Sequence, residues 1–244
     1  MNATFQSSVK PLSFIDIETV SGESSLELVS ERLQKEWLRK ASRIRTTEGC
    51  TDAELYFDRP AVYAEFGKII VIGLGFSHWE EADEPTFRVR TIHGHDEASV
   101  LRQFCTLIEK RYPRNLILCA HNGREFDYPY LCRRMMIHGI SIPRSLWNTH
   151  WKRYNSPHLD TMDYWKFGDF KNYTSLELLA ALFGIPSSKD TLSGSEVNTS
   201  YYHHDGLLSI AQYCREDVVV LAQLYLRYHQ MNLLQEKQII RLDL

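Results

Sequence analysis

Two carboxylates near the start of the chain, Asp16 and Glu18, are the first residues whose spacing suggests chemistry. They lie in the largely apolar run 14–19. In a β-strand, residues i and i+2 point to the same face, so the two acids would project together while Ile15 and Ile17 enter the opposite layer. Neighbouring carboxylates repel each other, and a divalent cation that prefers hard oxygen ligands would keep both ionised. An edge strand with a solvated polar face is the alternative interpretation.

A third acid, Asp127, follows a predicted strand that ends at Ala120 and leads into His121-Asn122-Gly123. Acids are favoured in the first turn of a helix by the helix dipole, which would explain Asp127 without any function. The functional interpretation is that this loop carries Asn122 and Asp127 to the end of the sheet where the first two acids lie.

The last long helix contributes Tyr213 and Asp217. Residues i and i+4 share one face of a helix, so a phenol and a carboxylate would point together toward one site. The structural alternative places Tyr213 in the core and Asp217 in solvent. Glu216 would face elsewhere and meet solvent.

In this order and spacing, the motifs resemble those of the DEDD superfamily of 3′→5′ exonucleases, which have a ribonuclease-H-like fold. The match rests on residues 14–19, His121 to Asp127 and Tyr213-x-x-x-Asp217. The last motif is similar to that of the tyrosine-type subclass, DEDDy. The segments 65–69 and 158–160 look most like stand-alone bacterial proteins similar to the proofreading exonuclease domain of family B DNA polymerases.

The resemblance, which extends over about residues 12–228, implies hydrolysis of terminal phosphodiester bonds with two divalent cations, Mg²⁺ or Mn²⁺, about 4 Å apart. Asp16 would bridge both ions, Glu18 and Asp217 would complete the shell of one, and Asp127 would hold the other. Tyr213 would orient the attacking water, since a phenol with a pKa near 10 is a poor base at neutral pH.

The resemblance also implies substrate contacts and a partner. Thr19, Asn122 and Phe126 match positions where the family touches the terminal nucleotide, although Phe126 could equally be a core residue. Asp160 matches a further acid of polymerase-type domains and would either support the site or cap a strand end. The expected partner is nucleic acid, with single-stranded DNA favoured. RNA is the alternative, because no residue here reveals how the site treats a 2′-hydroxyl.

Bulk composition limits other functions. The formal net charge of −3 provides no global positive field for nucleic acid, so any basic surface must be local. Five cysteines without a C-x-x-C pair and the lack of an apolar run long enough for a membrane span favour a cytoplasmic protein. Proofreading would require a polymerase or repair protein acting in trans. A catalytically silent nucleic-acid-binding module is a further alternative, against which the four intact acids argue.

Basic residues gather in two places where they could form such a local surface, although solvated helix faces explain them too. Lys68 could likewise reach a phosphate or simply face solvent. The two groups are Arg32, Lys35, Arg39, Lys40, Arg43 and Arg45 in the first helix, and Arg133, Arg134, Arg144, Lys152 and Arg153 around the second motif.

The positioning elements predict an α/β fold with a mixed central sheet flanked by helices, in a single exonuclease domain over 1–244 with a helical insertion at about 21–64. Thr174 and Glu177 form an apparent capping box, and the stretches 46–60, 187–204 and 229–244 read as two loops and a tail. The predicted strands are 12–17, 69–76, 87–92, 116–120 and 158–161, and the predicted helices are 26–43, a helix capped by Asp96, 126–138, 174–183 and 207–228.

Overall fold

A mixed six-stranded sheet forms the centre of the computed structural model, which describes residues 12–44, 51–78, 86–111, 116–146, 156–169, 173–186 and 194–242. The strand order is β5-β4-β1-β2-β3-β6. β2 is antiparallel to both β1 and β3, whereas β4 is parallel to β1 and to β5, and β6 is parallel to β3. The strands are β1 (Leu12–Ser21), β2 (Gly67–His78), β3 (Thr86–His93), β4 (Ile117–Ala120), β5 (Leu159–Asp160) and β6 (Ile239–Arg241).

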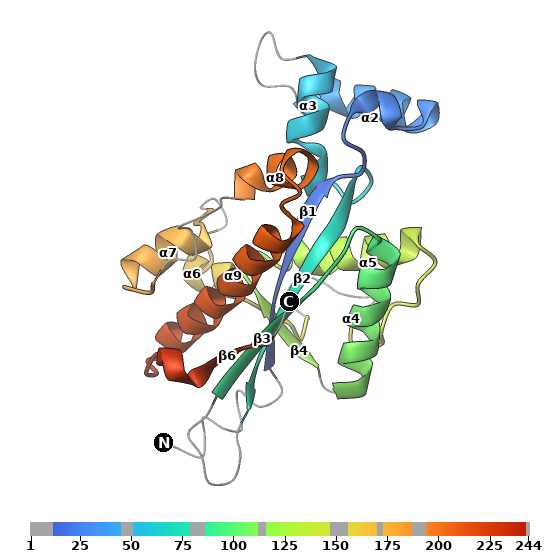
Figure 1. The fold of residues 1–244 in the computed structure, drawn as a ribbon. Helices are drawn as coiled ribbons and strands as arrows, with labels where there is room; N and C mark the ends of the chain where they lie inside the picture. The colour runs from blue at the N-terminus through green and yellow to red at the C-terminus, as the bar shows by residue number, and fades with distance from the viewer. Residues whose placement is uncertain are drawn as a thin grey trace.

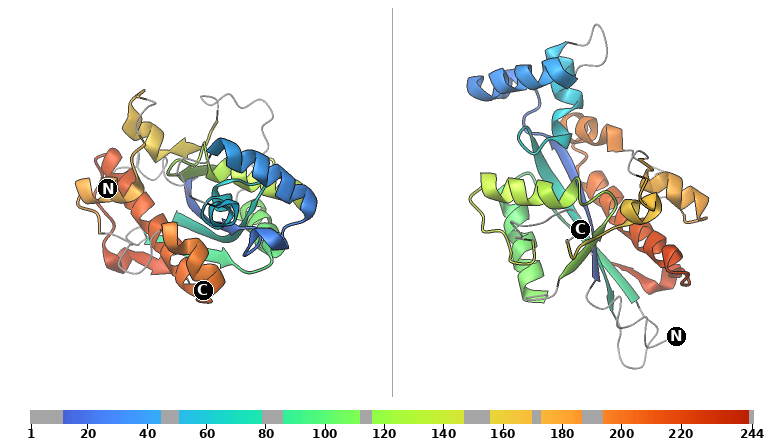
Figure 2. Two further views of the ribbon diagram at one scale, coloured as in Figure 1. Left: turned by 90° about the horizontal axis from the view of Figure 1, so that it is seen from above. Right: turned by 180° about the vertical axis from the view of Figure 1, so that it is seen from behind.

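Helices cover both faces of this sheet, as the sequence predicted (Figures 1 and 2). α4 (Glu97–Arg111) and α5 (Asp127–Ile137) lie on one face, and α9 (Leu207–Tyr228) crosses the other. The shorter helices α6 (Thr161–Lys166), α7 (Leu176–Leu182) and α8 (Val197–His203) lie on the α9 side. Among the described helices, none combines the length and apolar character that crossing a bilayer requires.

Alternation along β1 divides the core into two layers. Ile15 and Ile17 are buried with Phe104 of α4, whereas Phe14 faces the α9 layer. The ring of Phe14 makes edge contacts with Phe87 and Tyr225, with centroids 5.7 and 5.5 Å away. Asp16 therefore lies on the α9 face, as the period of two predicts.

The insertion after β1 forms an arm at one end of the sheet (Figure 1). It contains α2 (Glu31–Ile44), α3 (Asp52–Asp58) and the short 3₁₀ turn η2 (Pro60–Val62), and it has a small core around the fully buried Trp37. Asn198 of α8 ties the arm to the body, because its Oδ1 accepts from Ser21 N and its Nδ2 donates to the Phe57 carbonyl, both at 2.9 Å.

Several predicted boundaries were wrong for identifiable reasons. β1 continues to Ser21, and the first α-helix begins at Glu31 rather than Leu26, after a single 3₁₀ turn. α7 is capped by Ser175, whose hydroxyl accepts from Leu178 N, so the Thr174–Glu177 capping box does not form. The stretch 46–60, read as a loop, contains α3, with a capping box formed by Thr51 and Glu54.

The two other stretches read as irregular also contain regular structure. α8 lies within 187–204, of which residues 187–193 fall outside the described part of the chain. The tail supplies β6 at the sheet edge. Glu216 does not simply meet solvent, since both of its carboxylate oxygens accept from the Arg241 guanidinium at 2.8 Å and so tie α9 to β6.

Gly73 allows α9 to approach β2, and it provides the first test. A Cβ at this position would lie 2.8 Å from Val218 Cγ2 and 2.9 Å from Cys214 Sγ, closer than carbon atoms pack. We expect Gly73→Ala to destabilise the fold by about 1–3 kcal/mol in urea unfolding, because α9 must shift. Gly94→Ala is the control, since its Cβ would meet only Val100 Cγ2 at 3.4 Å. Equal stability of the two variants would contradict the packing described here.

His158 predicts a pH dependence of stability. Burial is the main cause that lowers the pKa of His158 to about 4, and its Nδ1 accepts from Leu118 N at 3.2 Å. The unfolded chain binds the proton more tightly, with a pKa near 6.5. The free energy of unfolding should therefore be unaffected by His158 above pH 6.5 and fall by on the order of 3 kcal/mol toward pH 4. His158→Asn, which keeps an acceptor near the Nδ1 position, should flatten this slope in urea unfolding; an unchanged slope would refute the assignment.

Candidate functional site

β1 presents Asp16 and Glu18 to the face of the sheet that α9 covers, and Thr19 follows them in the strand. Asp16 pairs with Gly73 and Glu18 with Val71 of β2, but Thr19 pairs with Ile69, so Ile70 is an extra residue in a bulge. Bulges increase local twist and redirect side chains. Just past the bulge, the hydroxyl of Thr19 donates to the Ala61 carbonyl of η2 at 2.8 Å, which ties this strand end to the arm.

α9 lies directly over these acids and brings Tyr213 and Asp217 to the same place. Both side chains line one cleft, as expected for positions i and i+4 of a helix. Between them on the sheet side is Cys214, whose buried thiol donates to Asp16 Oδ2 at 3.4 Å. The sequence analysis did not single out Cys214, although its position next to Tyr213, on a helix expected to pack over β1, could have suggested the contact.

The loop between β4 and α5 is held by Asp160. One carboxylate oxygen of Asp160 accepts from Asn122 N at 2.9 Å and from Met162 N at 3.0 Å, while the other accepts from Arg124 N at 3.0 Å. Asn122 has a φ of 65°, in the left-handed region that asparagine tolerates. Asp160 is therefore both a helix cap and a support of the loop that carries Asn122 and Asp127, so the two alternatives for this residue coexist.

A single cleft of about 620 Å³ contains the predicted residues. Side chains from the arm and from α7 complete its walls; among these, Asp58 and Tyr173 had not been singled out from the sequence, and Glu177 only as part of a capping box. Tyr173 is 71% exposed, which leaves its ring available to a ligand. The eight predicted residues, all of which line this cleft, are Asp16, Glu18, Thr19, Asn122, Phe126, Asp127, Tyr213 and Asp217.

Burial and the repulsion between neighbouring acids act together on the carboxylates of the cleft. Burial and then the charges of Glu18, Asp127 and Asp217 raise the pKa of Asp16 well above its usual range. Burial likewise raises the pKa of Asp127 to about 7, against the opposing effect of backbone hydrogen bonds. Within the described residues, no lysine or arginine lines the cleft, and burial lowers the pKa of its one imidazole, that of His121.

These acids fit divalent cations. Asp127 Oδ1 is buried and has no hydrogen-bond partner among the residues that the structure describes. Ligand atoms of Asp16, Glu18 and Cys214 lie within 4.8 Å of one another. An unsatisfied buried oxygen beside clustered carboxylates is stabilised by a hard cation, which would remove the repulsion. The raised pKa of the Cys214 thiol, caused mainly by burial, keeps this group a hydrogen-bond donor to Asp16.

The predicted basic surface is only partly available. Arg134 is engaged in the interior, where it donates to Glu97 Oε1 at 2.9 Å and to the Ala64 carbonyl at 2.8 Å, so it cannot serve as a phosphate contact. Lys68 lies 5.3 Å above the rings of Tyr201 and Tyr202 and is half-buried. Lys152 and Arg153 lie outside the described residues, as does Arg45.

Among solved structures, the chain is similar in fold to the family B DNA polymerase from the hyperthermophilic archaeon Pyrobaculum calidifontis. The TM-score is 0.52 at 13% identity, with 88% of this chain covered and 24% of the polymerase chain, so the chain spans about a quarter of that protein. The likeness supports the ribonuclease-H-like fold. A search of curated proteins returned no match.

The range matched by a protein-family model contains most of the residues that line the cleft. The model of a family described as a predicted 3′–5′ exonuclease related to the exonuclease domain of PolB matches residues 62–240. This range includes Asn122, Phe126, Asp127, Tyr213 and Asp217, whereas Asp16, Glu18 and Thr19 precede it. Because the match extends over well more than half of the sequence, the chain belongs to this family of predicted 3′–5′ exonucleases related to the exonuclease domain of PolB.

Proposed function

We propose that the protein is a metal-dependent 3′→5′ exonuclease of the tyrosine type that hydrolyses terminal phosphodiester bonds of DNA at single-stranded ends. The observation that carries this proposal is the convergence of the four predicted carboxylates and the phenol of Tyr213 in a single cleft, with a buried carboxylate oxygen of Asp127 that has no hydrogen-bond partner among the described residues. Such repulsion is retained in proteins mainly where a bound cation resolves it.

The four acids would hold two divalent cations, Mg²⁺ or Mn²⁺. Asp16 would serve both ions, Glu18 and Asp217 would serve one of them and Asp127 the other, and all four side chains line the same cleft. When bound, the ions would neutralise charge on the phosphate and make water a better nucleophile at neutral pH. Cys214 would fix the orientation of the Asp16 carboxylate by its thiol hydrogen bond.

Tyr213 would position the attacking water. Burial, and then the charge of Asp217, raises the pKa of this phenol above its usual value, so it keeps its proton at neutral pH. A protonated phenol can donate a hydrogen bond and hold a water, but it cannot accept the proton as a base. Tyr213 is therefore assigned to orientation rather than to proton abstraction.

Thr19, Asn122 and Phe126 would contact the terminal nucleotide. Phe126 is partly buried against Tyr130, with ring centroids 5.3 Å apart, and its remaining surface lines the cleft. The base of a terminal nucleotide would stack on such a ring irrespective of sequence. The exposed ring of Tyr173 on the α7 side offers a second stacking surface.

Labelled oligonucleotides test the proposed reaction. With Mg²⁺ or Mn²⁺, a 3′-labelled single-stranded DNA should lose its label as a mononucleotide, and a 5′-labelled strand should shorten stepwise; EDTA should stop both. A parallel RNA substrate separates the DNA enzyme from an exoribonuclease of the same superfamily. Failure of both substrates with either metal would favour a silent binding module and reject the proposal.

Substitutions in the cleft should separate the roles of its residues in the same assay. We expect Asp16→Ala and Asp217→Ala to abolish hydrolysis, while Tyr213→Phe should retain a small fraction, on the order of 1%, because orientation is weakened but the metal ligands remain. Glu109→Gln, an exposed acid on the far side of α4, is the control and should keep full activity. Full activity in Asp16→Ala would overturn the assignment.

Thermal unfolding tests the cation site without catalysis. In EDTA near pH 8, Asp16→Asn should melt a few degrees above the wild type, because one buried charge is removed from a repelling cluster. Adding Mn²⁺ should raise the melting temperature of the wild type and have a much smaller effect on the variant. A lower melting temperature for the variant in EDTA, together with an equal response to Mn²⁺, would argue against a cation site here.

A further inference from the structure

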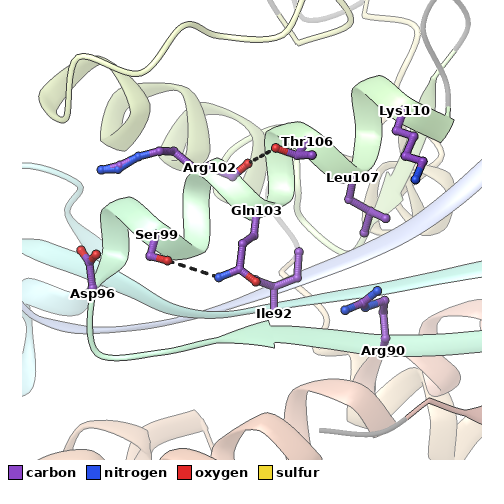
Figure 3. A pocket seen from close by; sticks show the side chains of 9 residues that line it. All are labelled: Arg90, Ile92, Asp96, Ser99, Arg102, Gln103, Thr106, Leu107 and Lys110. Carbon is purple, nitrogen blue, oxygen red and sulfur yellow. Dashed lines mark hydrogen bonds between the residues drawn. The ribbon is translucent and has the colours of Figure 1, made fainter.

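A second cleft lies between β3 and α4, on the face of the sheet opposite the acidic cleft (Figure 3). Its volume is about 480 Å³. Ile92 belongs to the core layer under α4, whereas Val89 faces α9, so Arg90 and Ile92 share the α4 side by alternation. The residues that line this groove are Arg90, Ile92, Asp96, Ser99, Arg102, Gln103, Thr106, Leu107 and Lys110.

The groove carries positive charge that no ion pair within the described residues neutralises. Arg90, Arg102 and Lys110 form no ion pair within the described part of the chain. The Nε of Arg90 is buried and has no hydrogen-bond acceptor among the described residues. The carboxylate of Asp96, at one end of the groove, accepts from Ala98 N at 3.1 Å as a helix cap. In a chain with a net charge of −3, such a concentration of unpaired cations marks a place for an anion.

The shape of the groove suits an extended anion. Lys110 and Arg90 reach into the space between α4 and β3 from its two sides, whereas the Arg102 side chain extends away from both of them, toward the start of α4 (Figure 3). Eight residues of helix separate Arg102 from Lys110, which corresponds to about 12 Å. Phosphates of a stacked strand recur every ~3.4 Å, so several would fit along this length.

The other lining residues offer contacts for a sugar–phosphate chain. Gln103 Nε2 donates to Ser99 Oγ at 3.3 Å, and Thr106 donates to the Arg102 carbonyl at 2.9 Å, which orders the polar side chains along the helix. Ile92 and Leu107 supply an apolar floor. A compact inorganic anion would use one cation at a time, whereas a chain of phosphates would engage all three.

We propose that this groove binds the phosphodiester backbone of a nucleic-acid strand outside the acidic cleft. The choice of nucleic acid over an acidic polypeptide rests on the proposed nuclease function. The position of the groove in the fold also supports the proposal. The C-terminal end of β1 pairs with the start of β2, and Glu97 at the start of α4 accepts from Ile69 N of the same part of β2 at 2.7 Å. The groove therefore begins at the end of the sheet where the acidic cleft lies, and a strand can pass around that end.

Equilibrium binding tests the groove separately from catalysis. Fluorescence anisotropy of a labelled single-stranded DNA of about 20 nucleotides, in EDTA at several salt concentrations, would compare the wild type with the double variant Arg102→Gln, Lys110→Gln. We expect about tenfold weaker binding and a salt slope smaller by about 1.4, from two lost phosphate contacts. The control Arg227→Gln, Lys237→Gln removes the same charge from exposed positions elsewhere and should bind like the wild type.

Two further arms make the result decisive. A strand of about four nucleotides, too short to extend beyond the acidic cleft, should be hydrolysed by the double variant at the wild-type rate, whereas the longer strand should show a raised KM. Equal binding of the long strand by the double variant and the control would overturn the proposal. The proposal would also be overturned if the double substitution weakened binding of a labelled oligoglutamate but not binding of the DNA strand. An inactive wild type would reject the proposed function but would leave the binding comparison intact.

Discussion

The fold brings the carboxylates of Asp16, Glu18, Asp127 and Asp217 together in one cleft, and their mutual repulsion is the constraint on which the rest of the site depends. Asp16 lies on the central strand, and the charges of Glu18, Asp127 and Asp217 add to its burial in raising its pKa. A protein without a ligand would gain stability by replacing any of these acids with an apolar residue. Positive charge in the cleft would relieve this repulsion, which is the physical basis of the proposed cation binding.

The surrounding scaffold holds the acids in place against that repulsion. Gly73 lets α9 lie close to β2, and Cys214 then donates to Asp16 from the same helix. Asp160 anchors the loop before α5 through backbone N–H groups. The ion pair of Glu216 on α9 with Arg241 on β6 fixes this helix against the sheet edge. Each contact joins elements that are distant in the sequence, so the site depends on the complete fold rather than on a local motif.

The sequence predicted the elements that carry strong periodic patterns. The long helix over 207–228 and the strands over 69–76 and 87–92 were all confirmed. In these elements the hydrophobic residues alternate or recur at helical spacing over many residues, and this pattern leaves little choice of secondary structure. Boundaries set by caps were less predictable, because Thr174 and Ser175 offer the same chemistry and only the surrounding packing selects Ser175.

The site was predictable to the extent that short motifs carry it. The residues that support it were not, since the contact of Cys214 with Asp16 and the wall formed by Tyr173 depend on long-range packing.

The number of cations in the cleft tests the central claim most directly. Titration of Mn²⁺ followed by electron paramagnetic resonance should give about two tightly bound ions per chain, and neither should bind tightly to Asp16→Ala. No bound Mn²⁺, or equal binding by that variant, would contradict the account.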